Sequence, residues 1–266
     1  MEKEVNSATF LSYNSTGIDN PVKCSWLNNI CDEYNVDFLS IQEHFKSSKK
    51  TDKFFRDQFP SYDSVIVPGY RSPGQDTGCA KAGLGQLIRK NLSIRRDRVT
   101  SKLYRVLHLP TISVLWINTY LPVDPQLTRN LDDTELQGCL NEVETIITNT
   151  AHDDIIWGSD LNWDLTRNTQ FSQIMKRFME KLNLVTLWSH YDISHTFEQI
   201  CRNGRVSHST VDHFVVSQRL LPLVEGCGVI HRGDNLSVHS PIWLKLQVGN
   251  LPLKKQTHTR NIKKPS

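Results

Sequence analysis

The sequence predicts an α/β protein in which two packed β-sheets are flanked by helices. Short apolar segments with the Val, Ile, Phe and Tyr content of strands recur along the chain, with turn residues between them. Helical patterns interrupt these segments at unequal intervals, which does not fit the regular alternation of a doubly wound sheet. With 266 residues, of which 38% are hydrophobic, the chain can bury one large core, and we expect one domain over residues 1–250.

Ten segments are predicted to be strands because each is a short apolar or alternating run between turn signals. They are residues 8–13, 38–41, 63–67, 83–89, 104–109, 113–120, 155–158, 212–217, 228–231 and 241–246. Three segments are predicted to be helices, at residues 21–34, 132–149 and 170–182. In the second of these, Leu136, Leu140 and Val143 recur at the spacing of three and four that places them on one helix face.

The positive charge of the chain is concentrated at its C-terminal end. The net charge is +3, but residues 251–266 carry five Lys and Arg side chains and no acidic one. Removing those five from the 31 basic residues leaves 26 against 28 acidic residues, so the rest of the chain is close to neutral. We expect residues 251–266 to be a flexible basic tail or linker, and nucleic-acid binding by the domain to depend on a local basic face.

The sequence shows no targeting or membrane signal. The first residues lack the basic-then-apolar order of a signal peptide, and no apolar run is long enough to cross a bilayer, so we expect an intracellular protein. Six cysteines are scattered without a Cys-x-x-Cys pair or a Cys/His zinc spacing. We expect them to be reduced and mostly buried.

Six predicted strands or strand edges deliver a polar group to one end. The most informative is the run Trp157-Gly158-Ser159-Asp160-Leu161-Asn162, where a carboxylate and an amide two residues apart end a buried strand. Along a strand this spacing points both side chains the same way, where they can hold a water against a phosphate. The other polar groups, in chain order, are Asn14, Glu43, Tyr120, Asp212 and His239.

This order of segments resembles the endonuclease/exonuclease/phosphatase superfamily over about residues 8–246. Within that superfamily it is similar to the AP-endonuclease-like domain of non-LTR (LINE-type) retrotransposons. The resemblance implies a four-layered α/β sandwich of the DNase I-like type. It also implies DNA as the partner and a monomer located in the nucleus. Residues 263–266 resemble the basic linker that leads to a reverse transcriptase in such retrotransposon proteins.

The resemblance also implies roles for the polar groups. Glu43 matches the principal metal ligand and Asn14 the amide beside it, in a site for Mg²⁺, with Mn²⁺ as an alternative. Asp160 matches the residue that orients or deprotonates the attacking water, and Asn162 the amide that steadies it. Tyr120 matches a phosphate-contacting phenol, while Asp212 and His239 match an acid–imidazole pair.

Two positions depart from the family pattern. The family usually has Ser-Asp-His where this chain has Ser237-Val238-His239, so a carboxylate near the metal is replaced by a side chain that cannot bind an ion. A second acidic position of AP endonucleases is Thr16 here. The leading interpretation is a Mg²⁺-dependent endonuclease that nicks one DNA strand and leaves a 3′-hydroxyl. A nucleic-acid-binding remnant with weakened or no activity, and a phosphoesterase of the same fold acting on another substrate, remain as alternatives.

Candidate DNA contacts lie in two loop regions. His195, Arg202 and Arg205 belong to a segment that we interpret either as a hairpin able to enter a groove or as a plain polar hairpin. Arg71 lies in the glycine-rich stretch at 69–85 and is a candidate phosphate contact.

Overall fold

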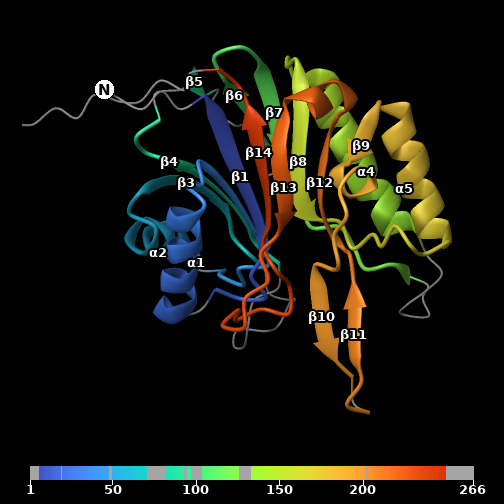
Figure 1. Cartoon of the computed structure of the whole chain (residues 1–266), viewed down its shortest axis with the longest axis horizontal. Helices are drawn as coiled ribbons and strands as arrows, with labels where there is room; N and C mark the ends of the chain where they lie inside the picture. The colour runs from blue at the N-terminus through green and yellow to red at the C-terminus, as the bar shows by residue number, and fades with distance from the viewer. Residues whose placement is uncertain are drawn as a thin grey trace, which may run out of the picture.

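The computed structural model describes residues 6–18, 20–47, 50–70, 82–92, 95–96, 104–125, 133–201 and 203–249. Two six-stranded mixed sheets stand face to face in this part of the chain (Figure 1). The first has the order β13 (Val224–Val229), β14 (Ile242–Gln247), β1 (Ser7–Asn14), β2 (Phe38–Gln42), β4 (Leu84–Arg89) and β3 (Tyr62–Val67). The second has the order β5 (Arg95–Arg96), β6 (Tyr104–His108), β7 (Ser113–Ile117), β8 (Asp154–Asp160), β12 (Asp212–Ser217) and β9 (Leu184–Thr186).

Helices cover the outer face of each sheet. Helices α1 (Pro21–Glu33) and α2 (Thr51–Gln58) share a buried apolar cluster with the first sheet. Helices α4 (Thr134–Asn149) and α5 (Gln170–Lys181) share another with the second sheet. The start of α1 is fixed locally, because the side chain of Asn20 accepts a hydrogen bond from the Lys23 amide and Pro21 occupies the first turn. The layers therefore follow the order helix, sheet, sheet, helix, as the sequence analysis expected.

The third core lies between the two sheets. Phe10 and Phe38 stack with ring centroids 4.6 Å apart, and Trp116 from the second sheet meets both rings edge-on. Phe214, which belongs to this core, packs over Gly158 of the neighbouring strand in the second sheet, since a Cβ at Gly158 would come within 2.4 Å of that ring. This packing holds the two sheets in one fixed relation.

Strand direction brings the polar strand ends to one edge of the sandwich. Strands β1 and β2 are parallel, as are β7 and β8, so their carboxyl ends point the same way within each sheet. Strand β14 runs antiparallel to β1 and β12 antiparallel to β8, so both begin where their partners end. Asp160 at the end of β8 consequently lies opposite Asp212 at the start of β12.

All ten predicted strands and three predicted helices are present, with shifts at their ends. The largest shift is at β13, which runs over Val224–Val229 although residues 228–231 were predicted. We did not predict α2, β9 or the two-residue β5, and we considered β10 (Phe197–Ile200) and β11 (Val206–Ser209) only as a hairpin. These two strands form a separate sheet that projects from the body of the molecule (Figure 1).

Among the described residues, buried thiols are fewer than expected, since Cys24 and Cys31 are buried while Cys139 and Cys227 are half-buried and Cys201 is exposed. Cys79 lies outside the described ranges. No helix in the described ranges has both the length and the apolar character needed to span a membrane.

Candidate active site

A cavity of about 420 Å³ opens at the edge where the polar strand ends meet. Segments from both sheets and from the β10–β11 hairpin contribute to its wall. The lining residues are Thr16, Glu43, Tyr120, Val123, Asp160, Asn162, Arg167, Phe197, Gln199, Ser207, Ser209, Val211, Val238 and His239. Five of the seven predicted catalytic and metal-binding residues line this cavity, and the other two, Asn14 and Asp212, are hydrogen-bonded to residues that do.

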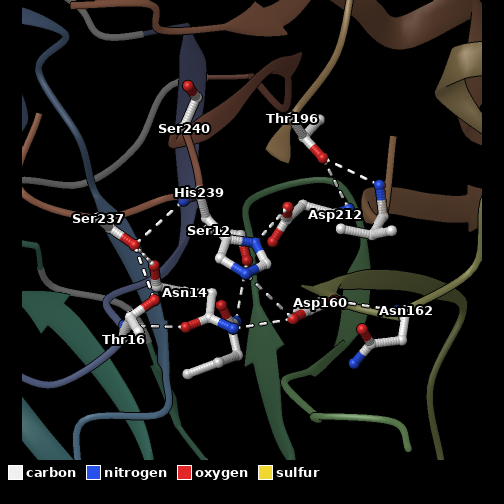
Figure 2. A network of polar contacts seen from close by, with 12 residues as sticks. Ser12, Asn14, Thr16, Asp160, Asn162, Thr196, Asp212, Ser237, His239 and Ser240 are labelled. Carbon is white, nitrogen blue, oxygen red and sulfur yellow. Dashed lines mark hydrogen bonds and ion pairs between the residues drawn. The ribbon is translucent and has the colours of Figure 1, made fainter. Parts of the chain in front are cut away.

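Asn14 connects the two carboxylates of the site. Its Nδ2 donates to Glu43 Oε2 at 2.9 Å and to Asp160 Oδ2 at 2.8 Å, so one amide fixes carboxylates from both sheets. Figure 2 shows the contact with Asp160. Its Oδ1 accepts a hydrogen bond from the Thr16 amide at 3.0 Å. In this arrangement Asn14 is an orienting group, since its oxygen is turned away from the carboxylates.

Glu43 and Asn162 both adopt left-handed backbone conformations, with φ of 51° and 49°. Such angles are uncommon outside glycine and recur at functional sites. Strand β8 ends at Asp160, so a turn, not the strand period, positions Asn162: its amide donates to Asp160 Oδ1 at 2.9 Å. Its side-chain Nδ2 donates to the Leu121 carbonyl at 2.7 Å, which fixes the amide group on the cavity wall.

Asp212, His239 and Asp160 form a buried chain of charged groups (Figure 2). His239 Nδ1 lies 2.9 Å from Asp212 Oδ2, while Nε2 on the other side of the ring lies 3.9 Å from Asp160 Oδ2. Burial would lower the pKa of His239, but the Asp212 and Asp160 carboxylates outweigh it and raise that pKa to about 9. The imidazole is therefore charged at neutral pH.

For Asp160, burial and a neighbouring carboxylate both favour the protonated form. Burial and the neighbouring Asp212 carboxylate raise the pKa of Asp160 above the usual range of a carboxyl group, against the lowering effect of His239 and of the Asn14 hydrogen bond. A carboxylate with a raised pKa is a better proton acceptor than an ordinary one.

A set of supporting contacts holds the Asp212–His239 pair in place. Thr196 Oγ1 accepts hydrogen bonds from the amides of Val211 and Asp212, both at 3.0 Å. Ser237 Oγ donates to the Asn14 carbonyl at 2.9 Å and accepts from the His239 amide at 3.1 Å (Figure 2). The pair is thus tied to the end of β1 as well as to β12.

Tyr120 lies beside the end of β8, where it forms an isolated parallel bridge with Asp160. Burial, with the Glu43 and Asp160 carboxylates nearby, raises the pKa of its phenol well above the ordinary value. The phenol consequently keeps its proton at neutral pH and can donate a hydrogen bond into the cavity.

The donor set fits a hard divalent cation. Glu43 and Asp160 offer carboxylate oxygens to the same cavity, and no thiol lines it. Asp160, Asp212 and His239 also place ligand atoms within 4.8 Å of one another. Mg²⁺ characteristically binds to one or two carboxylates and completes its shell with water and substrate phosphate, so Glu43 is positioned to hold it.

Solved structures share this architecture. The AP endonuclease LMAP from Leishmania major has a TM-score of 0.68 at 19% identity, over 91% of this chain and 88% of that one. An endonuclease/exonuclease/phosphatase family protein from Bacteroides thetaiotaomicron has a TM-score of 0.61 at 18% identity, over 90% and 97%. The endonuclease domain of TRAS1, a telomere-specific non-LTR retrotransposon, has a TM-score of 0.62 at 15% identity, over 91% and 99%. The chain has the endonuclease/exonuclease/phosphatase fold.

The fold of this chain is shared with solved structures, but its sequence matches no known family. No protein-family model matches the sequence, and no curated protein matches it significantly. The predicted four-layered sandwich is confirmed. The predicted site residues stay predictions, now with a defined geometry.

Within this endonuclease/exonuclease/phosphatase fold, Val238 stands on the cavity wall next to His239. Its side chain is 42% exposed, and its carbonyl accepts a hydrogen bond from the Glu198 amide at 2.9 Å. The backbone is therefore held in place, and the exposed side chain offers no ligand atom to the cavity.

Of the four candidate DNA contacts, those in the described part of the chain do not line the cavity. Arg71 and Arg202 lie outside the described residues. Arg205 is exposed just before β11. The side chain of His195 is 20% exposed, stacks on the ring of His208 and also contacts the ring of His231.

Two residues with clear positions in the site were not identified from the sequence. Arg167 lines the cavity and lies 3.5 Å from Asp164 Oδ2 in an ion pair, so it brings a cation to the site. Lys23 of α1 is buried and its Nζ donates to the Ser15 and Gly17 carbonyls at 2.8 Å, which braces the loop after Asn14. Arg167 lies only five residues after Asn162, so its closeness to the site could have been inferred from the sequence. The contacts of Lys23 depend on folding alone.

Proposed function

We propose that this protein is a Mg²⁺-dependent phosphodiesterase, and specifically a DNA endonuclease that nicks one strand and leaves a 3′-hydroxyl. The observation that supports this most strongly is the convergence of Glu43, Asp160 and His239 on one cavity from distant parts of the chain. A metal-binding carboxylate, a buried base and a charged imidazole are the groups that phosphodiester hydrolysis requires.

Asp160 is the proposed base. It accepts a proton from the attacking water, while the backbone turn to Asn162 fixes one of its oxygens and Asn14 fixes the other. Asn162 holds the water and a phosphate oxygen in line, because its amide group is already oriented by the Leu121 carbonyl.

His239 and Tyr120 stabilise the charge that develops on the phosphoryl oxygens. Asp212 keeps His239 in one orientation and charged, with Nε2 directed toward the reaction site. Mg²⁺ at Glu43 would supply the remaining neutralisation and polarise the phosphate.

The substrate and setting follow from the same proposal. Nicked DNA with a 3′-hydroxyl can prime reverse transcription, as in a non-LTR retroelement, which accords with the fold likeness to the TRAS1 endonuclease domain. We accordingly propose DNA as the partner, a reverse transcriptase in the same polyprotein and action in the nucleus.

Conversion of supercoiled plasmid to open circles in Mg²⁺ tests the proposal. Glu43→Gln removes one anionic ligand without changing shape, so we expect nicking to fall by about a hundredfold or more while DNA retention is kept. Glu180→Gln on the exposed face of α5 is the matched control and should nick like the wild type.

Equal nicking by the Glu43→Gln and wild-type proteins would refute the assignment of Glu43. A folded wild-type protein that releases inorganic phosphate from small phosphomonoesters but leaves plasmid intact would favour a phosphoesterase of the same fold. A second candidate, a nucleic-acid-binding remnant, is favoured by Val238, since this residue replaces a carboxylate beside His239.

A further inference from the structure

The β10–β11 hairpin has two faces with different chemistry. Phe197, Gln199, Ser207 and Ser209 face the cavity. Because strand side chains alternate, Glu198 and His208 point to the opposite face, where the strand register sets them directly across from each other. His195, just before β10, joins this pair.

The three side chains converge on a small volume. His208 Nε2 lies 2.9 Å and His195 Nε2 lies 3.8 Å from the same carboxylate oxygen, Glu198 Oε2. Ligand atoms about 2.0 Å from a tetrahedral ion are about 3.3 Å from each other. The two distances to Glu198 Oε2 are therefore within about half an ångström of the spacing in a tetrahedral site.

The imidazole rings of His195, His208 and His231 lie close together. The ring of His195 stacks on that of His208 at 4.1 Å and lies 4.5 Å from that of His231. Two imidazole nitrogens and a carboxylate suit Zn²⁺ and similar transition metals better than Mg²⁺.

We propose that His195, Glu198 and His208 form a transition-metal site, most suited to Zn²⁺, at the base of the β10–β11 hairpin. Water completes the coordination. The site is separate from the cavity that holds Glu43 and Asp160, and it does not depend on nuclease activity.

The metal would fix the hairpin relative to the catalytic pair. Thr196 and Phe197 lie between two of the ligands, and Thr196 Oγ1 accepts from the Asp212 amide. Phe197 packs edge-on against the His239 ring at 4.9 Å between centroids. His231 adds a further tie through its Nδ1, 3.2 Å from Ser240 Oγ. Metal binding to the hairpin would thus stabilise the positions of Thr196 and Phe197, which contact Asp212 and His239.

Zn²⁺ binding to the whole chain, measured by calorimetry and by metal analysis after dialysis, tests the site. We expect His208→Ala and Glu198→Gln each to remove one bound Zn²⁺ or to weaken it at least tenfold, with no competition from excess Mg²⁺. His190→Ala, an exposed histidine in the same part of the chain, should bind like the wild type. Glu43→Gln should also keep this Zn²⁺, which separates the site from the proposed catalytic metal.

Hydrogen exchange gives a readout independent of activity. Zn²⁺ should slow exchange of the amides in residues 196–201 and 205–209 in wild-type and His190→Ala proteins, but not in Glu198→Gln. Glu198→Gln preserves the side-chain shape, so it remains informative if His208→Ala does not fold. Equal Zn²⁺ affinity in wild type and both hairpin variants would overturn the proposal, as would a thiolate charge-transfer band on Co²⁺ substitution.

Discussion

Val238 is exposed on the cavity wall, so a carboxylate there would not be buried away from water. Val238→Asp should add a ligand, or an anchor for a metal-bound water, next to His239. We expect nicking to reach its maximum at a lower Mg²⁺ concentration and the rate to rise several-fold. Plasmid nicking across a Mg²⁺ titration measures both.

Val123→Asp is the matched control for this change. Val123 is 41% exposed and lines the same cavity, but unlike Val238 it is not next to His239 in the sequence. A gain in Val238→Asp alone would support the missing-ligand interpretation. A folded Val238→Asp protein without any gain, beside an inactive wild type, would favour the remnant.

At single residues, the sequence indicated which polar side chains meet at the cavity but not how each one is oriented. The sequence places a polar group at each strand end, and all seven meet in one site. It does not reveal that Asn14 turns its nitrogen to both carboxylates, or that Asn162 depends on a left-handed turn. Those orientations are decided by hydrogen bonds between residues far apart in the chain, such as Asn14 and Asp160.

At the level of elements, the β10–β11 hairpin gives a directional test of DNA binding. Ser207 points into the cavity and the adjacent Val206 points to the other face. If DNA passes along the cavity side, Ser207→Asp should weaken DNA binding about three- to tenfold at low salt, because a carboxylate repels phosphate. Fluorescence anisotropy with a labelled duplex measures the affinity.

Val206→Asp is the control, since it adds the same charge one residue away on the opposite face. We expect it to change DNA affinity less than Ser207→Asp. The reverse order would place DNA on the Val206 face, and equal small effects would place it away from the hairpin.

Elements with strong apolar periodicity were predicted, and short or polar ones were not. Helix α2 has eight residues, of which only Thr51 and Phe55 are buried, and its N-cap makes no side-chain hydrogen bond. Strands β10 and β11 are exposed along most of their length. Their structure depends on pairing with each other and on the Glu198 amide bonding to Val238, which no local pattern encodes.

For the whole molecule, Asp37 should make folding stability depend on pH. The carboxylate is 7% exposed and accepts a hydrogen bond from the Thr9 amide at 3.0 Å. Burial raises its pKa to about 6, despite that bond and the nearby Arg89. A raised pKa in the folded state means that the contribution of Asp37 to stability is full below about pH 4 and is lost as pH rises through about 6.

Asp37→Asn keeps the oxygen that accepts from Thr9 but cannot titrate. The unfolding free energy of the wild type minus that of the variant should therefore fall by up to about 3 kcal/mol between pH 4 and 7. Urea unfolding at several pH values measures this difference. Asp52→Asn, at an exposed carboxylate of α2, is the control, and the same pH dependence in both variants would contradict the argument.

The sequence by itself determined the layers of this protein and the chemistry at its strand ends, because apolar periodicity and turn residues act within a few neighbouring positions. Only the tertiary structure decided which side chains at the strand ends contact one another. Asn14 must meet Asp160 from the other sheet, Thr196 must reach the amide of Asp212, and His195 must meet His208 across a hairpin. Each contact depends on sheet order and on packing between the two sheets, and these are set by the summed burial of many apolar side chains, not by any local pattern.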